Sequence, residues 1–125
     1  MKIVLWDFQA PPPKPPIYQS AQAGWQTIAS GSVRFSREGI VSVRWGVLLQ
    51  AERKGWLFWR NTRDFQFRIE LGGKYVYSYE QPDVFEPLGL AAATVSEGAA
   101  EMFAMIYLPK DTRVTVRGLT VEILE

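Results

Sequence analysis

The stretch FQFRIELGGKYVYSY, residues 65–79, alternates apolar and polar side chains with a period of two. Apolar residues occupy every second position from Phe65 to Leu71, which is the pattern of a half-buried β-strand. The glycine pair at positions 72 and 73 permits a tight hairpin turn, because glycine accepts positive φ. The stretch therefore predicts a β-hairpin whose returning strand carries three tyrosines on one face: Tyr75, Tyr77 and Tyr79.

The same period recurs along most of the chain after Gly24. It is clear in IVSVRWGVLLQ (residues 40–50) and recurs in WQTIA, SVRFS, AEMFAMIYL, TRVTVRG and LTVEIL. About eight strands at a spacing of roughly 8 to 12 residues are typical of a β-sandwich. The predicted fold is an all-β, jelly-roll-like sandwich, and its core is expected to include nine apolar residues: Val41, Val43, Trp45, Val47, Phe65, Phe67, Ile69, Val114 and Val116.

Two further expectations follow from this pattern. Arg44 and Arg68 fall between core positions, so both are expected to be exposed and to tolerate alanine. The stretch LGLAAATVSEGAAEMF (residues 88–103) is the one helix-permissive part of the chain, but Gly98 interrupts it. At most one helical turn is expected there.

The length of 125 residues indicates a single domain with one core. Fourteen Lys and Arg stand against thirteen Asp and Glu, spread along the chain, so generic nucleic-acid binding is disfavoured. Nowhere does an apolar run approach about twenty residues, and the start, MKIVLWDF, is too short for a signal-peptide core. We expect a soluble protein that has no signal peptide and no membrane partner.

The chain contains neither cysteine nor histidine. These absences remove disulfides, thiolate chemistry, imidazole bases and the usual zinc ligand sets, so we predict no enzyme activity, no cofactor and no metal site. One alternative stays open in the stretch YEQPDVFEP, where three acids share a proline-bounded loop. A glycosidase carboxylate pair or a Ca²⁺ site there would use Glu80, Asp83 and Glu86.

Residues 1–16 are expected to form a separate arm ahead of the domain at residues 17–125. The run APPPKPP is extended, because proline fixes φ and lacks an amide donor, and it also matches the PxxP pattern of SH3 and WW ligands. The preceding segment KIVLWDF is strand-like and suits β-augmentation of a neighbour's sheet. Pairing within its own domain is the alternative. The predicted partner-binding residues are Ile3, Leu5, Trp6 and Phe8.

The stretch GWLFWRNTRDFQF (residues 55–67) holds five aromatic rings and two arginines. As a strand it would point Trp56 and Phe58 to one side and Leu57 and Trp59 to the other, which leaves one tryptophan at a surface. Packed core followed by a solvated turn is the ordinary interpretation of such a stretch. The candidate ligand surface comprises Trp56, Trp59, Arg60, Arg63 and Tyr77.

Three stretches together resemble the C1q/TNF-like jelly-roll domain, which occurs in secreted trimers and in bacteriophage fibre and head-decoration proteins. They are FSREGIVSVRWGV, FRIELGGKYVYS and MIYLPKDTRVTVRG, which match the family's aromatic–turn–strand, Gly-rich hairpin and strand–turn–strand pieces. Lys110 departs from the glycine that the family usually places before the turn aspartate. The resemblance implies a threefold assembly that binds partners at loops and outer surfaces and has no catalytic activity.

The predicted function is a non-enzymatic structural or attachment protein of a virion, such as a capsid-decoration, minor capsid or fibre-tip domain. It would assemble as a homotrimer and contact other capsid or fibre proteins, with the virion as its location. The alternative is a carbohydrate-binding module or lectin-like domain, in which the exposed Trp and Tyr rings would stack on a glycan.

Overall fold

The computed structural model of the chain describes residues 2–6, 16–80 and 85–124. Over these ranges the chain forms ten β-strands and no helix. The described part accordingly offers no helix with the length and apolar character needed to cross a membrane. The all-β prediction is confirmed, with ten strands in place of about eight.

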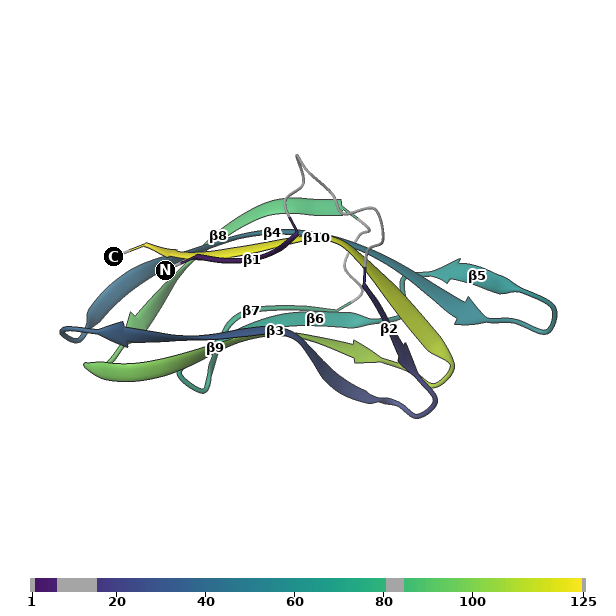
Figure 1. The fold of residues 1–125 in the computed structure, drawn as a ribbon, viewed down its shortest axis with the longest axis horizontal. Coiled ribbons are helices and arrows are strands. Elements are labelled where there is room, and N and C mark those ends of the chain that lie inside the picture. Colours follow the sequence, from purple (N-terminus) through teal and green to yellow (C-terminus); the bar gives the residue numbers. More distant parts are fainter. Residues whose placement is uncertain (1, 7–15, 81–84, 125) are drawn as a thin grey trace.

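The strands form two antiparallel sheets that lie face to face as an elongated, jelly-roll-like sandwich (Figure 1). The six-stranded sheet contains β1 (Lys2–Trp6), β2 (Ile17–Ser20), β4 (Gly39–Lys54), β5 (Trp59–Thr62), β8 (Phe85–Val95) and β10 (Thr112–Leu124). The four-stranded sheet contains β3 (Gly24–Phe35), β6 (Gln66–Leu71), β7 (Lys74–Glu80) and β9 (Gly98–Leu108).

The long strands β4 and β10 form the middle of the six-stranded sheet. They pair with each other from Arg53↔Thr112 to Ser42↔Leu124. On its other side, β10 pairs with β2 and then β1, whereas β4 pairs with β8 and then β5. Each central strand is thus flanked by two strands placed end to end, and β5 lies at the far end from both chain termini (Figure 1).

The four-stranded sheet follows the order β3-β9-β6-β7. The hairpin predicted for residues 65–79 forms its β6–β7 edge, with positive φ at both turn glycines, Gly72 and Gly73. One part of that prediction is wrong. Ile69 pairs with Tyr77 and Glu70 with Tyr75, so Val76 is an extra residue in a β-bulge. A bulge reverses the alternation, and Tyr75 therefore faces outward while Tyr77 faces the core.

All nine residues predicted for the core are buried, between 0% and 6% exposed. They pack with further inward-facing side chains from β3, β9 and β10, including Phe35, Ile106 and Leu119. Tyr18 on β2 adds a polar link between the sheets, because its hydroxyl donates to the Ile28 carbonyl on β3 at 3.3 Å. Burial raises the pKa of this phenol above its usual value.

Trp45, the largest of the predicted core residues, lies against the backbone of β8. Gly89 pairs with Trp45 across the sheet, and a Cβ at Gly89 would lie 2.2 Å from Cε2 of the indole. The ring of Tyr77 packs against Trp45 from the other sheet, with centroids 4.5 Å apart. A glycine is required at position 89 because the indole occupies the space of a side chain.

The helix-permissive stretch at residues 88–103 forms parts of β8 and β9 and contains no helical turn. β8 pairs with β4, and β9 lies between β3 and β6. Gly98, with φ 113°, begins β9 directly after the turn that joins the two strands. Tertiary pairing overrides the local helix propensity of its alanines, as is common for short segments.

The N-terminal segment pairs with its own chain, which is the alternative that the sequence left open. Lys2 pairs with Glu122 and Val4 with Thr120, so β1 covers the edge of the C-terminal half of β10. The Val116 amide also donates to the Pro16 carbonyl at 3.0 Å. Phe8 and most of the proline-rich run lie outside the described residues.

Candidate functional site

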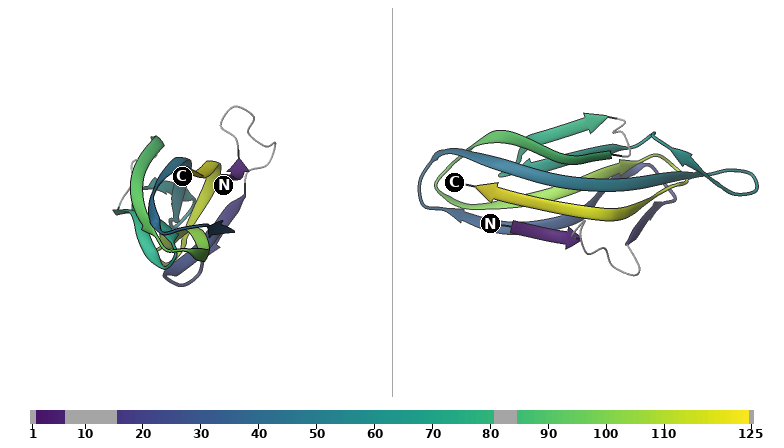
Figure 2. Two further views of the ribbon diagram at one scale, coloured as in Figure 1. Left: turned by 90° about the vertical axis from the view of Figure 1, so that its left-hand side faces the viewer. Right: turned by 90° about the horizontal axis from the view of Figure 1, so that it is seen from above.

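The β4–β5 hairpin projects beyond the end of the sandwich. It extends past the ends of the neighbouring strands in two views of the molecule (Figures 1 and 2). Lys54 and Trp59 are its last paired residues, and four residues connect them. We call these four residues, Gly55, Trp56, Leu57 and Phe58, the hairpin tip.

The hairpin tip is a tight turn closed by one backbone hydrogen bond. The Gly55 amide donates to the Phe58 carbonyl at 3.0 Å. A Cβ at Gly55 would lie only 2.7 Å from that carbonyl oxygen, so the turn requires glycine there. The prediction that Trp56, Leu57, Phe58 and Trp59 alternate along a single strand is therefore wrong, because the chain reverses direction at these residues.

Three consecutive large apolar side chains are exposed at the hairpin tip. Trp56 is 95% exposed, Leu57 74% and Phe58 60%. Isolated apolar residues are common on protein surfaces, but a contiguous apolar projection marks an interaction site. Of these three, the predicted ligand surface contained only Trp56. Gly55 follows the charged pair Arg53–Lys54, which is a sequence signal for a turn. That signal would have indicated that Leu57 and Phe58 are exposed.

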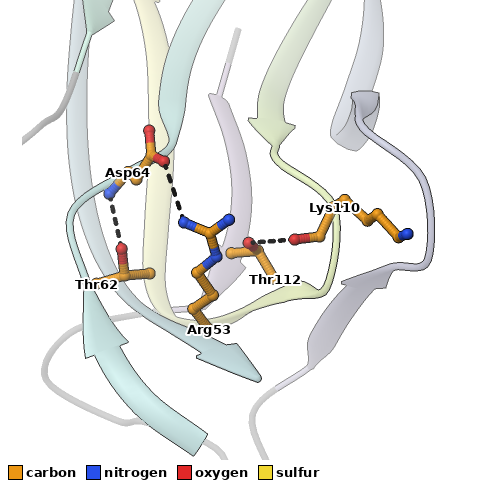
Figure 3. Close-up of polar contacts among 5 residues, drawn as sticks. All are labelled: Arg53, Thr62, Asp64, Lys110 and Thr112. Atoms are coloured by element: carbon orange, nitrogen blue, oxygen red, sulfur yellow. Dashed lines mark hydrogen bonds and ion pairs between the residues drawn. The ribbon is translucent and has the colours of Figure 1, made fainter. Parts of the chain in front are cut away.

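Cationic side chains surround the hairpin tip. The Arg60 guanidinium lies over the Phe58 ring, 5.4 Å from its centroid. Lys54 and Arg53 are also exposed, and Arg53 lies 3.9 Å from the Asp64 carboxylate, a separation that leaves the pair weak (Figure 3). The projection therefore combines an apolar end with a positively charged collar.

The base of the hairpin is held by contacts on both sides. The Lys54 amide donates to the Asp111 carbonyl at 2.8 Å, and the Asp111 amide donates to the Ser20 carbonyl at 2.9 Å. Beside Asp64, the Thr62 hydroxyl oxygen accepts from the Asp64 amide at 3.1 Å (Figure 3). The two backbone bonds join β2, β4 and the β9–β10 turn, which gives the tip a fixed support.

Trp59 belongs to this support and is only partly exposed. The Arg113 guanidinium lies 4.0 Å from the centroid of its ring, and the Nε of Arg113 donates to Glu52 at 3.2 Å. One face of the indole is therefore occupied by a cation that is itself held by a carboxylate. This arrangement stiffens the hairpin and removes that face from ligand stacking.

The structure separates the other predicted ligand-surface residues. Tyr77 packs in the core against Trp45 and Phe67, on the opposite sheet from the hairpin. Arg63 lines a cavity of about 530 Å³ beside the base of the hairpin, together with Asn61, Thr62, Arg117 and β4 residues 48–51. Only Trp56 and Arg60 of the predicted set lie at the hairpin tip or its collar.

Arg68 corrects a second expectation. Its guanidinium lies 3.8 Å from the ring centroid of Trp25 and 5.0 Å from that of Tyr75, and it donates to the Tyr75 hydroxyl at 3.1 Å. A carboxylate oxygen of Glu70 lies 3.4 Å away. The side chain is 16% exposed, against 54% for Arg44. Arg68 therefore joins three strands on the outer face of the four-stranded sheet and is not a free surface residue.

The described residues contain no group of three or more His, Cys, Asp or Glu side chains placed to hold a metal. Of the predicted acidic loop, Asp83 lies outside the described residues, whereas Glu80 and Glu86 belong to β7 and β8. The arm residues Ile3, Leu5 and Trp6 belong to β1. Their contact with a partner remains a prediction.

Searches found no family model and no curated protein that matches this chain. Among solved structures, dimeric latent PorU from Porphyromonas gingivalis aligns with a TM-score of 0.45 and 8% identity, over 88% of this chain and 12% of PorU. This chain therefore corresponds in length to a small part of that protein.

Two carbohydrate-binding modules also align. A family 35 module from Clostridium thermocellum has a TM-score of 0.36 and 13% identity, over 97% of both chains. A family 36 module in complex with calcium and xylotriose has a TM-score of 0.30 and 16% identity, over 86% of this chain and 98% of the module. The resemblance to C1q/TNF-like domains stays a prediction.

Proposed function

We propose that this chain is a non-enzymatic structural or attachment domain that binds its target through the hairpin tip. The observation that carries the proposal is the exposure of Trp56, Leu57 and Phe58, from 60% to 95%, on a projecting turn. Burying such side chains against a target yields roughly 1.5 to 3 kcal/mol each. A fixed support reduces the entropy that binding would cost.

The virion component predicted from the sequence is the narrower form of this proposal. In that form the chain assembles as a homotrimer on capsid or fibre proteins and the hairpin tip makes one of the contacts. A native mass of three times 14.2 kDa would support the trimer. A monomer would remove the trimer and leave the attachment domain in place.

The geometry favours attachment over the carbohydrate-binding alternative. A sugar platform needs several aromatic faces open on one surface. Arg113 covers one face of Trp59, and Tyr77 packs in the core. Trp56 is the one ring of the predicted ligand surface that is almost fully exposed, and it lies on a projecting turn, not on a broad face that several rings share.

Site-specific photo-crosslinking tests the proposal in the native setting of the protein. The photoreactive residue p-benzoylphenylalanine would replace Leu57 in one variant and Ile40 in the other. Both positions are 74% exposed, and they lie near opposite ends of β4 (Figure 1). We expect a specific adduct from position 57 and none from position 40. Equal labelling at both positions, or none at either, would contradict the proposal.

A further inference from the structure

The charges near the hairpin tip do not cancel. Glu52 contacts Arg113 at 3.2 Å, and Asp64 lies 3.9 Å from Arg53. Lys54 and Arg60 are exposed beside the tip, and the Arg60 guanidinium lies over the Phe58 ring. The whole chain carries a net charge of only +1, so this positive character is local to the hairpin.

We propose that the target of the hairpin tip is an anionic lipid surface. This inference rests on the proposed function, names its partner, and replaces the sequence-based expectation of no membrane partner. Trp56, Leu57 and Phe58 enter the boundary between headgroups and acyl chains, while Lys54 and Arg60 stay at the level of the lipid phosphates. Tryptophan is favoured at that boundary because its ring is apolar and its N–H is polar.

The shape of the tip favours lipid over a protein groove. A protein partner must present a hollow that matches three side chains projecting from one tight turn, whereas a fluid bilayer closes around a convex projection. The long side chains of Lys54 and Arg60 can lie along the inserted residues and keep their charges at the headgroups. Cations beside an apolar end are therefore complementary to an anionic membrane surface.

One backbone hydrogen bond inside the tip lowers the cost of entry into a less polar medium. An unpaired amide or carbonyl is costly to remove from water, and the Gly55 amide and the Phe58 carbonyl satisfy each other at 3.0 Å. At the base, the Lys54 amide donates to the Asp111 carbonyl. The tip can thus be inserted without breaking these bonds.

Vesicle flotation tests the inference by measuring how much protein binds to lipid. The full chain would be mixed with vesicles of phosphatidylcholine alone and with vesicles of phosphatidylcholine and phosphatidylglycerol. We expect binding to the anionic vesicles, much weaker binding to the neutral ones, and release by added salt. Fluorescence of bound protein should shift to the blue, and Trp56→Phe should remove most of that shift although four other tryptophans remain.

Matched variants distinguish insertion of the hairpin tip from nonspecific adsorption to vesicles. Leu57→Ser should weaken partition to anionic vesicles about tenfold. Ile40→Ser, with the same 74% exposure near the other end of β4, should leave it unchanged. Lys54→Gln and Arg60→Gln should each weaken it about fivefold, with no effect on neutral vesicles. Melting temperatures would confirm that all four variants are folded.

Absence of binding to anionic vesicles would overturn the lipid inference, and so would equal losses for Leu57→Ser and Ile40→Ser. The two proposals fail in different ways. A protein adduct from a crosslinker at position 57, without vesicle binding, would leave the attachment function standing and reject lipid as its target. Labelling no stronger at position 57 than at position 40 would reject the attachment function itself.

Discussion

Gly89 and Trp45 show how a single residue fixes the packing of the core. The indole of Trp45 lies where a side chain at position 89 would stand, 2.2 Å from an added Cβ. Gly89→Ala must therefore displace the ring or the β8 backbone. We expect a loss of about 1 to 3 kcal/mol in the free energy of unfolding, as for other overpacked cores, measured by urea denaturation.

Gly39→Ala is the matched control for this prediction. Gly39 lies in β4 and belongs to the same β4–β8 pairing, but an added Cβ there would meet no atom within 4 Å. Its unfolding midpoint should stay close to that of the unsubstituted chain. Equal stability of the two variants would show that Trp45 does not depend on the space at position 89.

Arg68 and Arg44 both fall between core positions in the sequence, but their contacts in the structure differ. Arg68 stacks on Trp25 and bonds to Tyr75, whereas Arg44 is 54% exposed and pairs with Glu122 at 2.6 Å. We expect Arg68→Ala to cost about 1 to 2 kcal/mol in unfolding free energy and Arg44→Ala less than about 1 kcal/mol. Thermal denaturation of both variants checks the order. A larger loss for Arg44→Ala would refute the assignment.

At the scale of elements, the hairpin tip is separable from the fold. Trp56, Leu57 and Phe58 are exposed and contribute little to the core. Replacing all three by serine should change the unfolding free energy by less than about 1 kcal/mol, since surface substitutions rarely exceed about 0.5 kcal/mol each. Trp59→Ala should cost more, because Arg113 packs on its ring. A large loss of stability in the triple variant would show that the tip contributes to the stability of the fold.

The first strand is the opposite case, because β1 pairs with β10 along the sheet edge. Deleting residues 1–6 would remove several backbone hydrogen bonds, each worth about 0.5 to 1.5 kcal/mol. We expect a folded chain with a lower melting temperature, since β4 and β2 still pair with β10. The newly open edge should also promote self-association, visible in sedimentation velocity. An unchanged melting temperature would mean that β1 adds nothing to the sheet.

How much the sequence could predict differs between elements. The period of two located the inward faces of β4, β6 and β10 correctly, because alternation follows directly from strand geometry. It failed at Val76, where a bulge shifts Tyr75 outward, and at Gly55, where a tight turn interrupts the aromatic run. Both features depend on which strands pair, and a local pattern does not contain that information.

At the scale of the whole molecule, the core and two surface features lie in separate parts of the sandwich. The core lies between the sheets, the Arg68 cluster lies on the outer face of the four-stranded sheet, and the hairpin tip lies at the end opposite the chain termini (Figure 2). All nine residues that the sequence predicted for the core are buried, and the core also contains others, such as Phe35, Ile106 and Leu119, that were not among them. Of the candidate site it predicted Trp56 and Arg60, but it grouped them with Tyr77, which the bulge in the pairing of β6 with β7 turns toward the core.

Hydroxyl-radical footprinting of the full chain, free and in its native assembly, tests the central claim most directly. The free protein should react strongly at Trp56, Leu57 and Phe58, in line with their exposure. If the hairpin tip is the attachment site, these three residues should become protected in the assembly while Ile40 stays reactive. Unchanged reactivity at the tip, with protection at Ile40 or elsewhere, would contradict the account.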